Sequence, residues 1–168
     1  LGLFEIAKNS NMEIVIIRPP LMYGPGVKGY FGHLLGLIKN NIPLPFKSID
    51  QNLRSFIYLE NFLNFLSIVI YHPGAINNIF ICSDKNDIST SELLNHLYLG
   101  MHNKNKLFRV SPVLLKASSF VIGKSNLYTK LTNSLVVDSS KASKILGWQP
   151  KINIERGLEI VAKDYLKN

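Results

Sequence analysis

The sequence of 168 residues is poor in cysteine and in acidic side chains, and it contains no long hydrophobic run. The single cysteine, Cys82, excludes an intrachain disulfide framework and is typical of a reducing compartment, so we expect a cytoplasmic protein. The longest apolar stretch is too short and too interrupted to cross a membrane. The four histidines, His33, His72, His96 and His102, do not have the spacing of metal ligands, and no structural metal is expected.

Acidic residues are absent from one long segment. Lys and Arg number 19 and Asp and Glu number 11, which gives a formal net charge of +8. The segment from Leu93 to Val137 has no Asp or Glu but carries the basic residues Lys104, Lys106, Arg109, Lys116, Lys124 and Lys130. Such a balance is typical of proteins that bind nucleic acid, an anionic membrane surface or a phosphorylated small molecule, and equally of a solvated lysine-rich face.

Several catalytic motifs are also missing from these 168 residues. The sequence has no Walker loop and no Gly-x-Ser-x-Gly nucleophile elbow. It has no Tyr-x-x-x-Lys either, because the residues four positions after Tyr23, Tyr30 and Tyr128 are valine, leucine and threonine. No complete set of acid, base and nucleophile is therefore predicted, and no catalytic residue is assigned.

The first third of the chain alternates helix and strand. Hydrophobic residues make up 46% of the sequence, enough for a packed core. The pattern predicts an opening helix that ends in a turn at Asn9–Asn11, and then a buried parallel strand over Glu13–Arg18. A loop over Pro19–Gly29 and a helix over about Tyr30–Lys39 are predicted to follow. A helix followed by a parallel-type strand is typical of the last part of a βαβ unit.

The rest of the chain continues the alternation, which indicates an α/β fold. Ile42–Phe46 is expected to be extended because of its prolines. Strands are predicted within 53–59, 77–83, 107–111 and 135–138. A helix is predicted over 60–71, and it should be buried because it is apolar on most sides. Further helices are predicted from Ser89 or Thr90 to about Met101, and from Pro112 onward. The last two are predicted from Asp138 or Ser139 to Gly147 and over about 154–165.

The loop over Pro19–Gly29 is a candidate binding element. It follows the carboxyl end of a predicted parallel strand, where open α/β sheets bind their ligands. Gly24 and Gly26 allow the backbone to approach a ligand, and Lys28 adds a positive charge. A tight turn stiffened by prolines is the alternative interpretation. Arg54 can bind a diphosphate through parallel N–H groups, although a surface arginine is the simpler interpretation of this residue alone.

Taken in order, several segments resemble the C-terminal half of an extended short-chain dehydrogenase/reductase. They are "RPPLMYGPGVKGYF", "IPLPF", "RSFIYLENF", "STSELLNHL" and "SLVVDSSKASKILGWQP". The resemblance is to the NAD-dependent epimerase/dehydratase family, in particular to UDP-glucose 4-epimerase-like proteins and UDP-N-acetyl-deoxyhexose ketoreductases of bacterial polysaccharide synthesis. It implies the C-terminal part of a Rossmann-type parallel sheet plus a small α/β substrate-binding domain. Residues 1–29 would complete the dinucleotide-binding domain, and 30–168 would mainly bind the substrate, with some segments returning to the sheet.

The resemblance also implies site residues. Arg18, Pro19 and Pro20 would border the nicotinamide end of NAD or NADP. The remaining residues would contact a UDP-sugar: Leu21, Lys28 and Phe31 beside the substrate, Leu44 and Phe46 at the uracil, and Arg54 and Lys130 at the diphosphate. Four positions depart from the family. Leu21 and Tyr30 stand where Asn is common, Lys47 stands where Gly commonly follows the extended segment, and Glu60 stands in place of the usual Asp.

The family's glycine-rich cofactor loop and its catalytic Tyr-x-x-x-Lys would lie before Leu1. The chain opens within an amphipathic helix without a cap, so we expect a fragment that is inactive alone and does not bind NAD tightly. The intact protein of this family can form a homodimer. The alternatives are a non-catalytic basic module that binds an anionic membrane or nucleic acid, and a non-functional gene remnant. Aromatic residues do not alternate with the lysines in a stacking pattern, which argues against single-stranded nucleic acid.

Overall fold

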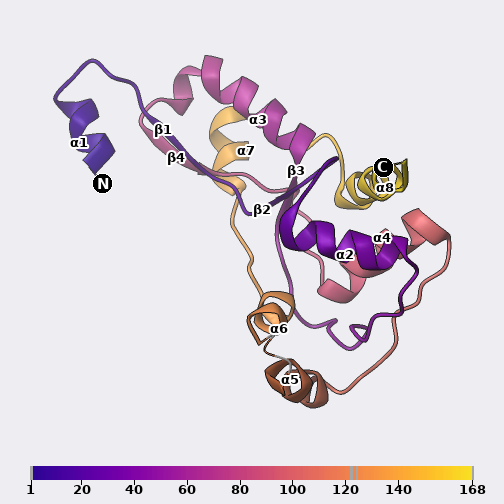
Figure 1. The fold of residues 1–168 in the computed structure, drawn as a ribbon. Helices are drawn as coiled ribbons and strands as arrows, with labels where there is room; N and C mark the ends of the chain where they lie inside the picture. The colour runs from indigo at the N-terminus through magenta and orange to yellow at the C-terminus, as the bar shows by residue number, and fades with distance from the viewer. Residues whose placement is uncertain (1, 122, 124, 168) are drawn as a thin grey trace.

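The computed structural model describes residues 2–121, 123 and 125–167, without the side chain of Leu127 (Figure 1). Its centre is formed by two short pairs of parallel strands. β1 (Val15–Arg18) pairs with β4 (Asn78–Ile81), and β2 (Leu21–Tyr23) pairs with β3 (Phe56–Tyr58). Parallel strands joined through helices confirm the predicted α/β class.

The chain changes strand partner at Pro19–Pro20. β1 ends at Arg18, which is in register with Ile81, and β2 begins at Leu21, which is in register with Phe56. Proline has no backbone N–H for a strand ladder, so two prolines end one pairing before the next begins. The prediction of a single loop over Pro19–Gly29 is therefore wrong, because the first part of it forms β2.

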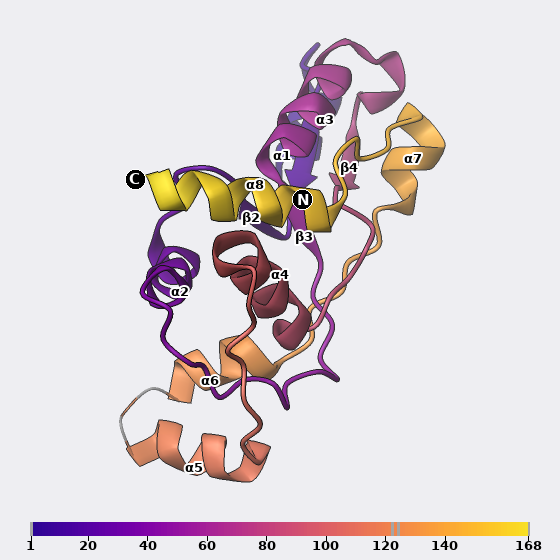
Figure 2. The same cartoon turned by 90° about the vertical axis from the view of Figure 1, so that its right-hand side faces the viewer.

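Helices pack on both strand pairs. α2 (Gly29–Lys39), α4 (Thr90–His102) and α8 (Ile154–Lys167) lie together beside β2 and β3, and α8 packs along α4 (Figure 2). A Cβ on Gly100 would lie 2.7 Å from the Cβ of Ala162, so the two helices approach closely because residue 100 is glycine. The predicted stripe on α8 is buried at Ile154, Leu158 and Val161.

A second hydrophobic cluster lies on β1 and β4. α3 (Leu59–Tyr71) and α7 (Ser140–Leu146) flank these strands, and the ring centroids of Phe65 and Trp148 are 5.1 Å apart. The expectation that α3 is buried on most sides is wrong, because Leu63, Ile70 and Tyr71 are exposed. Only one side of this helix packs on the strands. A short 3-10 helix, η1 (Pro73–Ala75), follows α3.

The helix ends follow the predicted signals. Ser89 Oγ accepts from the backbone N–H of Glu92 at 3.1 Å, and Glu92 Oε2 accepts from the N–H of Ser89 at 2.8 Å. This capping box begins α4 at the predicted position. α7 ends at Gly147, whose φ of 64° is the left-handed conformation that glycine adopts readily.

Two helices lie apart from the central strands. α5 (Pro112–Val121) and α6 (Ser125–Thr132) form a hairpin at the lower end of Figure 1, and α6 was not predicted. The strands predicted over 107–111 and 135–138 are wrong, because Leu107 and Leu135 each form only an isolated bridge. α1 (Gly2–Lys8) has no buried residue and stands away from the rest of the structure. None of the helices of the described residues is long and apolar enough to span a membrane.

Candidate functional site

A cavity of about 280 Å³ lies beside the start of β2 and β3. It brings together four of the residues that the family resemblance assigned to the substrate, namely Leu21, Phe31, Arg54 and Lys130. They lie far apart in the sequence and reach the cavity from β2, α2, the segment before β3, and α6. The rest of its lining is Tyr30, Leu34, Phe56, Thr90, Leu93 and Leu131.

Arg54 is held in the cavity wall by its backbone and its guanidinium. Its backbone N–H donates to the carbonyl of Ile88 at 3.0 Å, and its carbonyl accepts from the N–H of Ile88 at 3.2 Å. Nη1 donates to the backbone carbonyl of Lys130 and, at 3.3 Å, to that of Asn133. The arginine is thus fixed against the C-terminal end of α6, where carbonyl groups favour a cation.

A buried polar network fixes the neighbouring wall. Asn52 Nδ2 donates to Thr90 Oγ1 and to the carbonyl of Leu131, both at 3.0 Å. Thr90 Oγ1 also donates to the Leu131 carbonyl at 2.6 Å, and its N–H donates to Asn52 Oδ1 at 3.1 Å. This network joins the first residue of α4 to α6, so the cavity wall does not depend on a single loop.

Tyr30 stands between this cavity and a second hollow. Its hydroxyl oxygen is buried and has no hydrogen-bond partner among the described residues. Burial raises the pKa of Tyr30 above its ordinary value, and the positive charge of Arg54 partly opposes that rise. A buried hydroxyl without a partner is uncommon in proteins, so Tyr30 is a candidate for a ligand contact. The sequence analysis noted this position only as a departure from the family.

The second hollow, of about 510 Å³, contains the predicted uracil residues. Leu44 and Phe46 line it together with Tyr30, His33, Leu34, Leu37 and Pro45. The extended segment is held by backbone bonds to residues after α4, because Leu44 N–H donates to the carbonyl of Lys106 at 3.3 Å and Phe108 N–H donates to that of Leu44 at 3.1 Å. Tyr30 and Leu34 belong to both hollows, which are therefore adjacent.

The segment that leads into α2 has a glycine pattern that the sequence analysis missed. Gly26, Gly29 and Gly32 have the spacing Gly-x-x-Gly-x-x-Gly and run from the loop after β2 into the start of α2. Gly26 and Gly29 have φ values of 72° and 66°, which favour glycine. The N-cap residue Lys28 makes no side-chain cap hydrogen bond.

Four predicted residues lie outside these two hollows. Lys28 is exposed and lines neither of them. Arg18 and Pro19 are exposed at the carboxyl end of β1, and Pro20 is half-buried before β2. Their proposed contacts with substrate or cofactor remain predictions.

The opposite end of the β2–β3 pair carries a buried polar junction around Asp84. Tyr23 Oη donates to Asp84 Oδ2 at 3.0 Å, the N–H of Tyr58 donates to the same oxygen at 3.0 Å, and Asn61 Nδ2 donates to Asp84 Oδ1 at 2.8 Å. Burial raises the pKa of the Asp84 carboxyl, although these three hydrogen bonds oppose the rise. Burial and the neighbouring Asp84 carboxylate raise the pKa of Tyr23.

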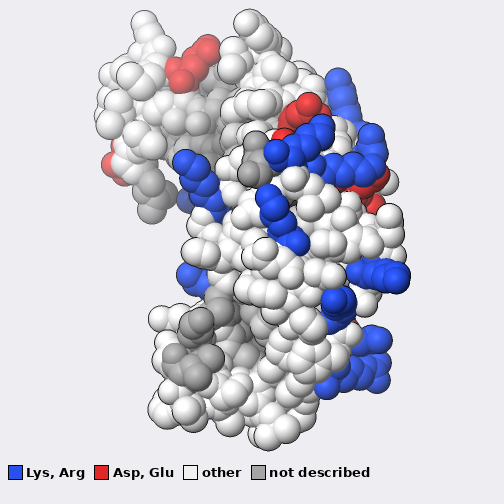
Figure 3. All heavy atoms as spheres, turned by 45° about the vertical axis from the view of Figure 1, so that its right-hand side comes forward, with Lys and Arg blue, Asp and Glu red and all other residues white. Residues whose placement is uncertain are grey.

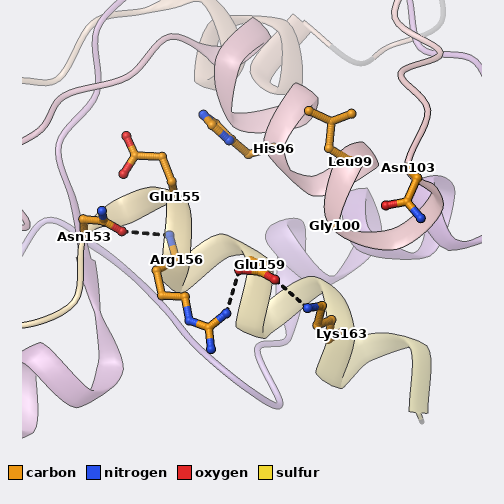
Figure 4. A pocket seen from close by; sticks show the side chains of 9 residues that line it. All are labelled: His96, Leu99, Gly100, Asn103, Asn153, Glu155, Arg156, Glu159 and Lys163. Carbon is orange, nitrogen blue, oxygen red and sulfur yellow. Dashed lines mark hydrogen bonds and ion pairs between the residues drawn. The ribbon is translucent and has the colours of Figure 1, made fainter.

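Another hollow, of about 480 Å³, lies between α4 and α8 (Figure 4). It contains none of the predicted site residues. Three of its four charged side chains pair with one another, because Arg156 Nη1 and Lys163 Nζ lie 2.7 Å and 2.5 Å from the two carboxylate oxygens of Glu159. With Glu155 the two positive and two negative side chains balance, so the hollow has no excess positive charge for a phosphate, and we place the candidate site at Arg54.

Comparison with solved structures defines the class of the fold. The UDP-glucuronic acid 4-epimerase of Bacillus cereus, solved with NAD, matches 98% of this chain with a TM-score of 0.70 and 20% identity, over 46% of its own length. The UDP-glucose 4-epimerase of Thermotoga maritima, solved with UDP-glucose, matches 99% with a TM-score of 0.68 and 16% identity, over 50% of its length. At these identities the likeness shows the fold.

Sequence comparison gives a particular relative. The chain is 38% identical over 165 residues to a UDP-glucose 4-epimerase of Vibrio cholerae, a match that covers 98% of this chain and 50% of that protein. No protein-family model matches the chain. Its homologues and structural neighbours are members of the NAD-dependent epimerase/dehydratase family, which confirms the relationship predicted from the sequence. The chain spans about half the length of these relatives, as expected for a C-terminal half.

Proposed function

We propose that this chain is the substrate-binding portion of an NAD(P)-dependent nucleotide-sugar epimerase or reductase, and that the cavity at Arg54 binds a UDP-sugar. The observation that carries the proposal is the meeting of Leu21, Phe31, Arg54 and Lys130 around one cavity. Leu44 and Phe46 line the adjacent hollow. A nucleotide sugar needs both a site for the diphosphate and a flat apolar site for the base.

The diphosphate is assigned to the cavity with the basic residues. A guanidinium has five N–H donors, and the two hydrogen bonds that the Arg54 guanidinium makes to described residues both use Nη1. Nε and Nη2 are then the donors for phosphate oxygens, with the ammonium of Lys130 on the same wall. The first turn of α2 supports this assignment, because backbone N–H groups at a helix N-terminus favour an anion.

The uracil is assigned to the hollow between α2 and the extended segment 42–46. The side chain of Leu44 is buried in its wall, and Phe46 is half-buried. Apolar and aromatic walls suit the faces of a base. Tyr30 separates the two hollows, so its hydroxyl is placed to hydrogen-bond the part of the ligand that joins base and phosphates.

The sugar chemistry is assigned to residues outside this chain. In the intact enzyme NAD(P) would exchange a hydride with a sugar carbon, and the tyrosine of Tyr-x-x-x-Lys would move the proton. Arg18, Pro19 and Pro20 at the end of β1 are proposed to border the nicotinamide, but they line neither hollow and make no cradle by themselves. We therefore expect binding of UDP by this chain without tight binding of NAD.

The test is calorimetric titration of the folded chain with UDP. The wild type is expected to bind, and Arg54→Ala is expected to weaken binding by about tenfold, as for a charge-assisted hydrogen bond. Arg109→Ala is the matched control, since Arg109 is exposed and lines neither hollow. Equal losses for both variants, or no binding by folded wild type, would contradict the proposed site.

A second measurement tests the placement of the catalytic residues. The chain is incubated with NAD and a UDP-sugar, and product formation is followed. No turnover is expected. Turnover by the folded chain would show that the catalytic residues lie within these 168 residues, and the division into binding and catalytic halves would then be wrong.

A further inference from the structure

The α5 helix presents an apolar stripe to solvent. Val113, Leu114, Phe120 and Val121 are 75%, 64%, 79% and 83% exposed. Their spacing places them on one side of the helix, whereas Leu115 and Ser119 face the opposite side and are buried. A helix on a globular protein normally turns its apolar side inward. Here the apolar side is turned outward, which is typical of an interaction surface.

The neighbouring α6 helix extends this surface into a groove. A hollow of about 550 Å³ runs between the two helices, lined by Val113, Ala117 and Phe120 of α5 and by Tyr128 and Thr129 of α6 among others. Tyr128 Oη donates to the carbonyl of Pro112 at 3.2 Å, which ties α6 to the start of α5. Figures 1 and 2 both show the hairpin at one end of the molecule, so the groove is open to a large partner.

The charges around this surface are basic. Lys116 lines the groove, and Arg109 is exposed just before α5. No Asp or Glu occurs from Leu93 to Val137. In Figure 3 the lowest part of the molecule shows mainly white side chains, with blue lysine or arginine side chains at its right-hand edge and no red acidic one. The surface therefore combines an apolar centre with a positive border.

We propose that the α5–α6 hairpin docks on an anionic lipid membrane surface. Phe120, Val121 and Leu114 enter the boundary between headgroups and acyl chains, while Lys116 and Arg109 face the lipid phosphates. An apolar stripe with basic neighbours matches the two chemistries of such a surface, which is negatively charged outside and apolar beneath. The proposal does not depend on the nucleotide-sugar site, because the stripe residues do not line it.

The positive charge and the apolar centre of this surface argue against a second copy of the chain and against nucleic acid as its partner. A second copy of this chain seated on the same face in a symmetric dimer would bring two basic surfaces together without acidic residues to pair with them. Nucleic acid would match the lysines but leave the apolar centre unused, since its affinity comes mainly from phosphate contacts. An anionic membrane matches both the apolar centre, through its acyl chains, and the positive border, through its phosphates.

The test is co-sedimentation of the full chain with phosphatidylcholine vesicles prepared with and without phosphatidylserine. Binding is expected only with phosphatidylserine, and it should weaken as salt is raised. Phe120→Ser and Lys116→Glu are each expected to weaken binding about tenfold. Tyr71→Ser is the matched control, because Tyr71 is an aromatic residue that is 86% exposed on α3. All three positions are exposed, and thermal unfolding checks that each variant folds.

Four results would overturn the proposal. They are absence of binding by folded wild type, equal binding to vesicles with and without phosphatidylserine, an equal loss in Tyr71→Ser, and no loss in Phe120→Ser. Sedimentation velocity without vesicles tests whether this surface binds a second copy of the chain. A dimer that Phe120→Ser converts to monomer would assign the face to self-association instead of to lipid.

Discussion

The two ends of the β2–β3 pair carry polar clusters of opposite kinds. At the carboxyl end, Asp84 accepts from Tyr23, Tyr58 and Asn61, and each of its oxygens has a donor. At the other end, Arg54 lies in a cavity wall and Tyr30 has a buried hydroxyl without a partner among the described residues. The first cluster is complete by itself, whereas the second is not.

We propose that this difference separates a structural polar cluster from one that binds a ligand. Asn61 also donates from Nδ2 to the Ile152 carbonyl at 2.7 Å, and its Oδ1 accepts from the N–H groups of Lys151 and Ile152 at 3.0 and 3.1 Å. The junction thus joins β2, β3 and α3 to the segment after β4 and the segment before α8. The cavity at Arg54 also brings together separate segments of the chain, but the hydroxyl of Tyr30 in its wall has no hydrogen-bond partner among the described residues. A bound ligand would supply such a partner.

The largest effect on the free energy of unfolding is expected from Asp84→Asn. The carboxylate accepts from three donors, and an amide would turn its own N–H₂ group toward one of them. The free energy of unfolding should fall by about 2 to 3 kcal/mol, because a buried donor loses its acceptor. Urea unfolding at neutral pH measures the change. A loss below about 0.5 kcal/mol would contradict the structural role of the junction.

The same variant has an expected pH dependence. Burial holds the pKa of folded Asp84 above the ordinary 3.8, so the stability linked to its protonation is present in full below that value and is lost as pH rises through the raised pKa. Asn does not titrate. The stability gap between wild type and Asp84→Asn should therefore narrow as pH rises from about 4 toward neutrality. Urea unfolding at several pH values tests this, and a widening gap would contradict it.

A smaller effect is expected from Tyr23→Phe. The substitution removes one of the three donors to Asp84 and leaves the ring in the core. The free energy of unfolding should fall by about 1 kcal/mol, as for one hydrogen bond. Affinity for UDP should stay unchanged, because Tyr23 lines neither hollow of the candidate site. If Tyr23→Phe changed the affinity for UDP but not the free energy of unfolding, the roles assigned to the two ends of the β2–β3 pair would be wrong.

The smallest effect on stability is expected from the matching change, Tyr30→Phe. Its hydroxyl has no protein partner to lose, so the free energy of unfolding should stay within about 0.5 kcal/mol of wild type. Affinity for UDP should fall by roughly fivefold if the hydroxyl bonds the ligand. Titration and urea unfolding of the two phenylalanine variants side by side test the comparison. Unchanged affinity in Tyr30→Phe would remove Tyr30 from the site.

Local signals located much of the fold in advance. The capping box at Ser89 and Glu92, the stop at Gly147 and the buried stripe of α8 all depend on residues a few positions apart. The family resemblance assigned Leu21, Phe31, Arg54 and Lys130 to the substrate, and these four residues line one cavity. α6 escaped prediction because Ser125–Thr132 has few strongly apolar positions and no acidic residue at its start.

The sequence by itself determined the α/β class and most helix ends, because each follows from short-range pattern, and the family resemblance supplied the candidate substrate residues. Only the tertiary structure decided that Leu21–Tyr23 is a strand, because its partner Phe56–Tyr58 lies more than thirty residues away. The same holds for the unpartnered hydroxyl of Tyr30 and for the outward stripe of α5. Whether a polar group finds a partner, and whether an apolar face is covered, depends on segments that meet only when the chain has folded.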